Sequence, residues 1–599
     1  MVVSSEPHSI PTGLRWTRSF AVQLITGRWF MIFSSFLIMS VSGASYMFAL
    51  YSRDIKSVLG YDQSTLNLLS FFKDLGSNIG ILSGLLNEVT PPFVVVSVGA
   101  ILNFFGYFMI WLAVNRKFTH PPSVPLMAFY VFVGANSHCS TNTGVVVTSV
   151  KNFPGSRGIV IGMLSGYLGL SAAIITQLFY AFYGNDSKSL LLLMAWLPTA
   201  TSFLFLPVIR HHKGLQQPND TRNFYKFVYL SLLLAGFLLI IIILEKCLKF
   251  TQSEYYLASS FMLLLLILPV VVVISEELNL WRAKKQQEPQ KVVETIATEK
   301  PKLDEYENTT KHREEAASSA SGSCSWWSNI FRKPERGDDY TILQAILSLD
   351  MAILFSAVIC GLGGTLTVVN NLSQIGTALG YSPHSITTFV SLMAIWIYLG
   401  KIAQGVISEF MVTKLKFPRP FMLTLILVLS CVGHLLVAFN VPNGLYVASI
   451  IIGFCFGANW PILFTIISEL FGLKYYSTLY NVGSVASPIG SYLMSVRVAG
   501  YLYDKEAMRQ LAEKGLKRKE GEELNCNGNE CYRLAFFIIA GVTLFGALVS
   551  LILVARTRRF YRSDIYEKFR EKEEDINNHT NETEMGVVAH KQDGQPRAN

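Results

Sequence analysis

The chain has 599 residues, of which 51% are hydrophobic and 15% are charged, and its mean hydropathy is +0.38. A chain so apolar and so poor in charge is not a soluble protein of this size, so its composition indicates a polytopic membrane protein. The formal net charge is +9, but the Lys and Arg residues are scattered over loops, tails and predicted membrane edges. The absence of a basic stripe argues against nucleic-acid binding.

Residues 1–28 form a polar N-terminal segment. The apolar run at 29–51 is too long for a signal-peptide core and indicates a retained first helix. A membrane span takes roughly 20 apolar residues. That length predicts five more helices, at 65–87, 91–114, 124–150, 158–183 and 189–209. These six make a first unit, residues 29–209, and two extra spans follow at 224–247 and 255–275, within 224–275.

A segment rich in Glu, Lys, Ser and Ala, residues 276–340, cannot pack a core and is predicted to be a disordered linker. A second unit of six helices occupies residues 343–556 and is followed by a charged tail, 557–599. Its helices are predicted at 343–370, 384–408, 420–439, 444–470, 478–502 and 533–556. The expected fold is therefore all-α, with about fourteen transmembrane helices.

The second unit repeats landmarks of the first at matching depths in its apolar segments. Gly43 and Leu59-Gly60-Tyr61 return 320 residues later as Gly363 and Leu379-Gly380-Tyr381, and Gly134-Ala135-Asn136 returns as Gly457-Ala458-Asn459. Recurrence in register and in the same helix order predicts two parallel six-helix repeats, an arrangement typical of secondary transporters.

The distribution of Lys and Arg in short loops predicts the orientation of the chain. The loops at 371–383 and 440–443 contain neither residue, whereas the loops on the side of the termini are basic. Both termini and the linker are therefore expected in the cytoplasm. The loop 503–532 would then lie outside, where Cys526 and Cys531 could form a disulfide and Asn185 is a glycosylation candidate. The plasma membrane and the vacuolar membrane both remain open.

Two sequence stretches carry a resemblance to a known family. The run Lys73-Asp74-Leu75-Gly76 through Glu88 to Pro91-Pro92, and Ser408-Glu409 leading to Pro418-Arg419-Pro420, resemble the plant nodulin-like branch of the major facilitator superfamily, the nuclear-fusion-defective type. The resemblance implies two six-helix bundles and membrane transport. The superfamily's usual signature between helices two and three is a Gly-rich turn with an acidic residue followed by basic residues, and the first copy departs from it. Pro91-Pro92 stand where basic residues are expected, whereas the second copy keeps Lys414, Lys416 and Arg419 after Glu409.

Small residues form two stripes that predict close helix packing. The residues concerned are Gly76, Gly80 and Gly84 on helix two, and Gly158, Gly162 and Gly166 on helix five. The resemblance places these helices at the seam between the bundles. The stripes, with Glu88 and the second-copy pair Gly405 and Glu409, would then serve either gating or static packing.

The fourth helix contains the most polar intramembrane stretch, residues 136–143. Unpaired polar groups facing lipid cost several kcal/mol each. Asn136, His138 and Asn142 are therefore expected either to line a cavity or to form hydrogen bonds between helices, and His138 could titrate near neutral pH. Because the family's first and fourth helices line the central path, the resemblance adds five further candidates: Ser42, Tyr46, Asn370, Asn459 and Trp460.

Two cations lie within predicted spans, Lys401 and Arg497. Intramembrane charges are costly and are functional by default, so this pair would suit a small organic anion. The alternative has Lys401 paired with a carboxylate and Arg497 reaching outward to the membrane interface.

The sequence therefore predicts a secondary transporter that moves a small solute, such as a monocarboxylate, by alternating access. A proton or another ion is a candidate coupling partner, and a monomer in the bilayer is expected. Nothing in the sequence resembles a catalytic triad, a nucleotide site or a metal site, so no enzymatic activity, cofactor or metal is expected. The alternative function is a membrane scaffold or receptor-like protein that acts through the linker and the tail.

Overall fold

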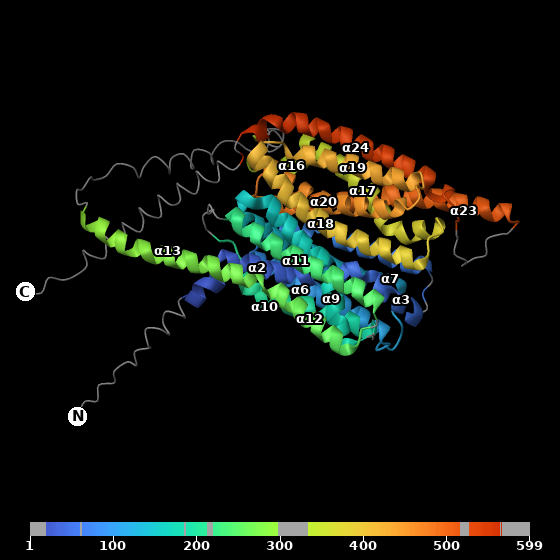
Figure 1. Cartoon of the computed structure of the whole chain (residues 1–599), viewed down its shortest axis with the longest axis horizontal. Coiled ribbons are helices and arrows are strands. Elements are labelled where there is room, and N and C mark those ends of the chain that lie inside the picture. The colour runs from blue at the N-terminus through green and yellow to red at the C-terminus, as the bar shows by residue number, and fades with distance from the viewer. Residues whose placement is uncertain are drawn as a thin grey trace, which may run out of the picture.

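The computed structural model describes residues 20–59, 61, 63–184, 187–212, 220–248, 250–297, 334–515, 526–563 and 565. All regular elements in these ranges are helical. Two bundles lie side by side, the first in blue to green and the second in yellow to red (Figure 1). The protein is thus an all-helical, multi-pass membrane protein. Asn185 lies outside the described residues, as do positions 298–333 and 566–599 of the linker and tail.

The first bundle follows the chain from Arg28 to Val208. Its elements are α2 (Arg28–Val41), η1 (Ala44–Met47), α3 (Phe48–Leu59), α4 (Gln63–Asn78), α5 (Ile81–Val89), α6 (Pro92–Val114), α7 (Val124–Asn142), η2 (Thr143–Val147), α8 (Thr148–Asn152), η3 (Pro154–Ser156), α9 (Arg157–Tyr183), α10 (Ser187–Phe205) and η4 (Leu206–Val208). Pro92 starts α6 at a position where a helix has no use for a backbone N–H.

The second bundle follows the short helix α16 (Ile342–Ile346). Its elements are α17 (Leu349–Ala378), α18 (Pro383–Leu415), α19 (Arg419–Ala438), α20 (Gly444–Leu470), α21 (Tyr476–Ser484), α22 (Ala486–Ser491), the π-helical segment η5 (Tyr492–Gly500), α23 (Tyr501–Glu513) and α24 (Glu530–Arg562). The start of α17 is capped by the Ser348 hydroxyl and that of α18 by the Ser382 hydroxyl.

Within the described ranges, eleven helices are long and apolar enough to cross a membrane. The other three predicted spans, 65–87, 124–150 and 478–502, are interrupted or change helix type. At the first of these, α4 ends at Asn78 and α5 begins at Ile81. A Cβ at Gly80 would lie 2.7 Å from the Cβ of Cys139, so this break can pack only around glycine. The fourteen-helix count therefore stays a prediction, because polar and broken spans fall below the length and hydropathy of a regular one.

The two extra spans form α11 (Asp220–Cys247) and α12 (Gln252–Ile267), and Pro269 then opens α13 (Pro269–Ala297). The prediction of a linker beginning at 276 is wrong, because residues 276–297 continue α13 as a helix, which extends toward the left in Figure 1. The α11 helix contacts both α9 and α18. The Tyr398 hydroxyl on α18 donates to Ser231 on α11 over 3.0 Å, so the extra helices join both bundles.

Beyond η5, α23 projects at the right of Figure 1 and packs on the start of α24. Cys526 and Cys531 form a disulfide, as the sequence predicted. The backbone N–H of Cys526 donates to the Tyr503 hydroxyl over 3.1 Å. This pair of contacts fixes the chain between α23 and α24.

At the seam, which is the contact surface between the two bundles, each repeat contributes its second and its fifth span. The fifth span of the first bundle, α9, packs on α18, and the second span, here α5, packs on α21. A Cβ on Gly162 would lie 2.8 Å from the Lys401 carbonyl, and one on Gly84 would lie 2.8 Å from that of Ser477. Backbones therefore touch directly at the seam, which is the arrangement that glycine stripes permit in a membrane.

Candidate functional site

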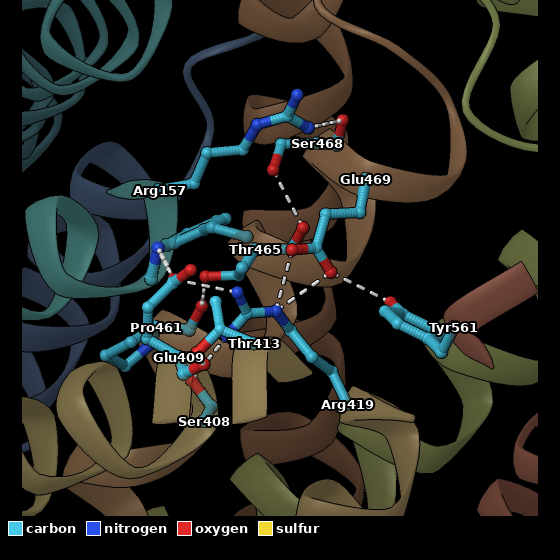
Figure 2. A network of polar contacts seen from close by, with 12 residues as sticks. Arg157, Ser408, Glu409, Thr413, Arg419, Pro461, Thr465, Ser468, Glu469 and Tyr561 are labelled. Carbon is cyan, nitrogen blue, oxygen red and sulfur yellow. Dashed lines mark hydrogen bonds and ion pairs between the residues drawn. The ribbon is translucent and has the colours of Figure 1, made fainter. Parts of the chain in front are cut away.

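A buried charge network surrounds Arg419, the first residue of α19 (Figure 2). Arg419 is fully buried, and its Nε donates to Glu469 over 2.7 Å. Its Nη2 donates to Glu409 over 2.8 Å, and its Nη1 donates to the Ser408 hydroxyl over 2.6 Å. The Tyr561 hydroxyl donates to Glu469 over 2.9 Å. A buried arginine is stable only when its charge and its donors are satisfied in this way.

The same network reaches across the seam to the first bundle. The backbone N–H of Gly158 donates to Glu409 over 3.1 Å, so this carboxylate sits at the N-terminus of α9. Arg157 donates from Nη1 to the Ser468 carbonyl over 2.7 Å, as Figure 2 shows. A carboxylate at a helix N-terminus is favoured by the helix dipole and by the unpaired N–H groups there. The network therefore connects the start of α9 in the first bundle to α18 and α20 in the second.

The first copy has a counterpart built from different parts. Glu88 accepts a hydrogen bond from the backbone N–H of Thr478 over 3.2 Å, near the start of α21. Its cationic neighbour is Lys151 on α8, at 3.7 Å. Asn87 donates to the Ser477 hydroxyl over 2.6 Å in the same region. Lys151 therefore takes the place of the basic loop residues that Pro91 and Pro92 displace.

Polar contacts between the bundles continue toward the middle of the molecule. Asn481 donates to the Thr143 hydroxyl over 2.8 Å, and Asn142 donates to the Tyr480 hydroxyl over 2.6 Å. The ring of Tyr480 stacks on Phe464 with the centroids 3.8 Å apart. Asn142, Phe464, Tyr480 and Asn481 also line a central cavity between the bundles.

The cavity lies between the bundles and has a volume of about 110 Å³. Both bundles contribute to its wall. The lining residues are Ser45, Tyr46, Asp74, Ser77, Asn78, His138, Cys139, Asn142, Ser165, Leu168, Leu366, Lys401, Phe456, Trp460, Phe464, Tyr480, Asn481, Ser484, Ser487, Pro488 and Ser491. Five candidates from the sequence thus meet here: Tyr46, His138, Asn142, Lys401 and Trp460.

Lys401 is the buried cation of this cavity, with 4% of its surface exposed. Its Nζ donates to the Ser165 carbonyl over 3.1 Å and lies 5.9 Å from the centroid of the Tyr46 ring. No carboxylate of the described chain lies within ion-pair distance of Nζ, so the alternative of a Lys401 ion pair is not realised. An ammonium in this position has further N–H donors to offer to a ligand.

Four of the candidates lie away from the cavity. Asn136 donates to the carbonyls of Gly76 and Ile79, which the break between α4 and α5 leaves open. Asn459 is buried and donates to Cys455 within its own helix. Asn370 is exposed and lies outside the lining residues. Arg497 is likewise exposed and stacks on Tyr492, because η5 turns it outward, so the proposal that it faces the cavity is wrong.

Two carboxylates that could be taken for proton carriers have partners. Asp350 is held between Arg336 at 2.8 Å and Arg556 at 2.5 Å, at the end of the bundle near the termini. Asp74 pairs with Lys73 at 2.8 Å and is 42% exposed, although it lines the cavity. Neither carboxylate is available to neutralise Lys401.

Sequence reasoning missed most of the wall contributed by residues 476–491. Tyr480, Asn481, Ser484, Ser487 and Ser491 all line the cavity. Their signal was present in the sequence, since hydroxyl and amide side chains recur along this predicted span. A repeat-based search would have aligned this span with α9, which supplies Ser165 and Leu168 to the opposite wall.

Comparison with known proteins identifies the fold. The structure resembles that of the major facilitator superfamily proton:xylose symporter XylE bound to 6-bromo-6-deoxy-D-glucose, with a TM-score of 0.51 and 13% identity, over 89% of this chain and 96% of that one. Two family models match, Nodulin-like over residues 28–274 and NFD4, C-terminal domain, over residues 341–563. The fold is that of the major facilitator superfamily.

Relatives narrow the class further. The chain is 25% identical over 547 residues to Protein NUCLEAR FUSION DEFECTIVE 4 of Arabidopsis thaliana. This match covers 89% of each of the two chains. It is also 24% identical over 165 residues to Probable transporter MCH1 of Wickerhamomyces anomalus, over 27% of this chain and 33% of that protein. The chain thus combines a Nodulin-like region, residues 28–274, with an NFD4 C-terminal domain, residues 341–563, on a fold of the major facilitator type.

Proposed function

We propose that this protein is a secondary transporter that moves a small organic anion, such as a monocarboxylate, through the central cavity by alternating access. Its fold and its likeness to proteins named as probable transporters support transport as the general activity. The observation that supports an anionic substrate is the environment of Lys401. This buried ammonium lines the cavity and has no carboxylate partner in the described chain. An unpaired buried cation is costly, and an incoming carboxylate would offset that cost.

The remainder of the wall suits the same class of substrate. The aromatic rings of Tyr46, Trp460 and Phe464 supply apolar surface, while Asn142 and Asn481 supply amide groups. Ligand sites of this kind combine mostly apolar walls with a few placed polar groups. A carboxylate at Lys401 would leave the small organic part of the anion against the rings.

The hydrogen bonds between the bundles also support an orientation for the cycle. Those of Asn87, at the end of α5, and of Arg157 and Gly158, at the start of α9, belong to helix ends that the predicted topology assigns to the cytoplasmic side. With the termini in the cytoplasm, this arrangement is the state closed toward the cytoplasm. Opening to the cytoplasm then requires the contacts of Glu88 and Glu409 across the seam to separate.

The test is uptake of labelled pyruvate, lactate, benzoate and oxalate by liposomes that contain the purified protein. We expect Lys401→Met to lower uptake of the transported anion about tenfold to a hundredfold, because a charge-assisted hydrogen bond contributes roughly 1.5–3 kcal/mol. Lys414→Met, on the exposed end of the same helix, is the matched control. Arg497→Ala should leave uptake near the wild-type rate. No uptake of any of the four anions, or unchanged uptake in folded Lys401→Met, would contradict the proposal.

A further inference from the structure

His138 and Lys401 come from different bundles and meet the same tyrosine. The His138 ring lies edge-on to Tyr46 with the ring centroids 5.9 Å apart, and the Lys401 ammonium is 5.9 Å from the same ring centroid. All three side chains line the central cavity. The two basic groups therefore share one small space, and both lie near the ring of Tyr46.

The surroundings of His138 define which of its nitrogens can accept a proton. Nδ1 lies 3.4 Å from the Ser42 carbonyl oxygen. A carbonyl only accepts hydrogen bonds, so this contact assigns a hydrogen to Nδ1. The neutral ring then leaves the lone pair of Nε2 to accept a proton, and the hydrogen bond found for this ring in the described chain is the one at Nδ1. His138 thus has a free basic site at the cavity wall.

A second, smaller pocket adjoins the other side of the same ring. It has a volume of about 10 Å³ and is lined by Ser42, Asn103, Ser137, His138, Thr141 and Ser202, with Ala100 and Pro198. This room and polarity suit a single water molecule. The imidazole therefore lines both the central cavity and a polar pocket inside the first bundle that has room for a water molecule beside the ring.

Charge decides when His138 can bind that proton. The titratable groups that share its cavity are Tyr46 from η1, Asp74 from α4, Cys139 from its own helix, Lys401 from α18 and Tyr480 from α21. Asp74 is paired with Lys73, so Lys401 is the unpaired charge among them. A second positive charge beside Lys401 is repelled strongly in a poorly solvated cavity. A carboxylate bound to Lys401 removes this repulsion.

We infer that His138 is a proton-binding site that is filled together with the anion, so that one carboxylate and one proton cross as a pair. This inference rests on the proposed function. The carboxylate stays ionised at Lys401, the proton adds to Nε2 of His138, and the charge of the cavity is the same with both bound as with neither. Linkage is reciprocal, so the proton must favour anion binding as much as the anion favours protonation.

The experiment uses liposomes that contain the full-length protein, labelled pyruvate and a pH-sensitive dye in the lumen. Inward pyruvate should acidify the lumen, and an acidic exterior should raise accumulation severalfold. His138→Gln keeps a side-chain donor for the Ser42 carbonyl but cannot take up a proton. We expect it to lose both acidification and the response of pyruvate accumulation to the pH gradient, and to need a higher pyruvate concentration for half-maximal exchange, as reciprocal linkage requires. His120→Gln, in the exposed loop before α7, is the matched control, and protein-free liposomes correct for leakage of the undissociated acid.

Each result decides between the alternatives. Exchange without acidification in the wild type would overturn the proton site and leave anion transport standing. Acidification that persists in His138→Gln, or that is lost instead in Asp74→Asn, would also overturn it. If His138→Gln does not fold, the wild-type response to the pH gradient decides alone, and its absence refutes the pairing. No exchange at all in the wild type would count against anion transport itself.

Discussion

Both copies of the repeat make polar contacts across the seam between the bundles, but the contacts of the second copy are more deeply buried than those of the first. In both, an acidic residue from the second span accepts a backbone N–H at the start of a helix across the seam, Glu88 from Thr478 and Glu409 from Gly158. In the second copy, Arg419 and both of its carboxylates are buried, whereas Lys151 beside Glu88 is 21% exposed and 3.7 Å away. Buried, multiply hydrogen-bonded pairs are costly to break, and partly hydrated pairs are cheap. The seam therefore has a strong side, α9 with α18, and a weak side, α5 with α21.

The largest expected effect is that of Arg419→Ala. This change leaves Glu409 and Glu469 buried without their cation, which costs about 3–5 kcal/mol. We expect a large fall in the unfolding midpoint of the purified protein in detergent. Lys414→Ala, at the exposed end of α18, should leave the midpoint unchanged. Equal midpoints for Arg419→Ala and the wild type would show that the second copy is not the strong side.

A smaller loss is expected from Gly162→Ala on α9. The added Cβ would lie 2.8 Å from the Lys401 carbonyl and 2.9 Å from the Cα of Gly405, so the two backbones must move apart. Overpacking of this kind costs about 1–3 kcal/mol. The same measurement of the unfolding midpoint applies, with Gly541→Ala on α24 as the control, since a Cβ there meets no atom within 4 Å. A stable Gly162→Ala protein would mean that the contact between α9 and α18 is loose.

The smallest effect is expected from Glu88→Gln. Its partner is distant and partly hydrated, so the ion pair contributes about 1 kcal/mol or less. Measured beside it, Glu409→Gln should lower the unfolding midpoint more, because it removes a carboxylate from buried Arg419. If the two substitutions have equal effects, the difference between the two copies disappears, and both sides of the seam would separate with similar ease.

Sequence patterns predicted the structure well where they relate positions of the two repeat copies to each other. Aligning the two copies of the repeat matches Gly405 with Gly84 and Glu409 with Glu88, and all four residues lie at the seam. Patterns failed for Arg497, because helix phase in a π-helical segment cannot be counted at 3.6 residues per turn.

Apolar length, duplication and the positions of glycine were therefore sufficient to predict a two-bundle membrane protein with a polar centre, since a bilayer imposes these patterns directly on the chain. Only the tertiary structure decided which polar residues face the cavity. It directed Lys401, His138 and Tyr46 into one space and turned Asn136, Asn459 and Arg497 elsewhere. The physical reason is that a polar side chain in a membrane must find a partner, and whether that partner is a neighbouring backbone or a solvated gap depends on how the helices pack.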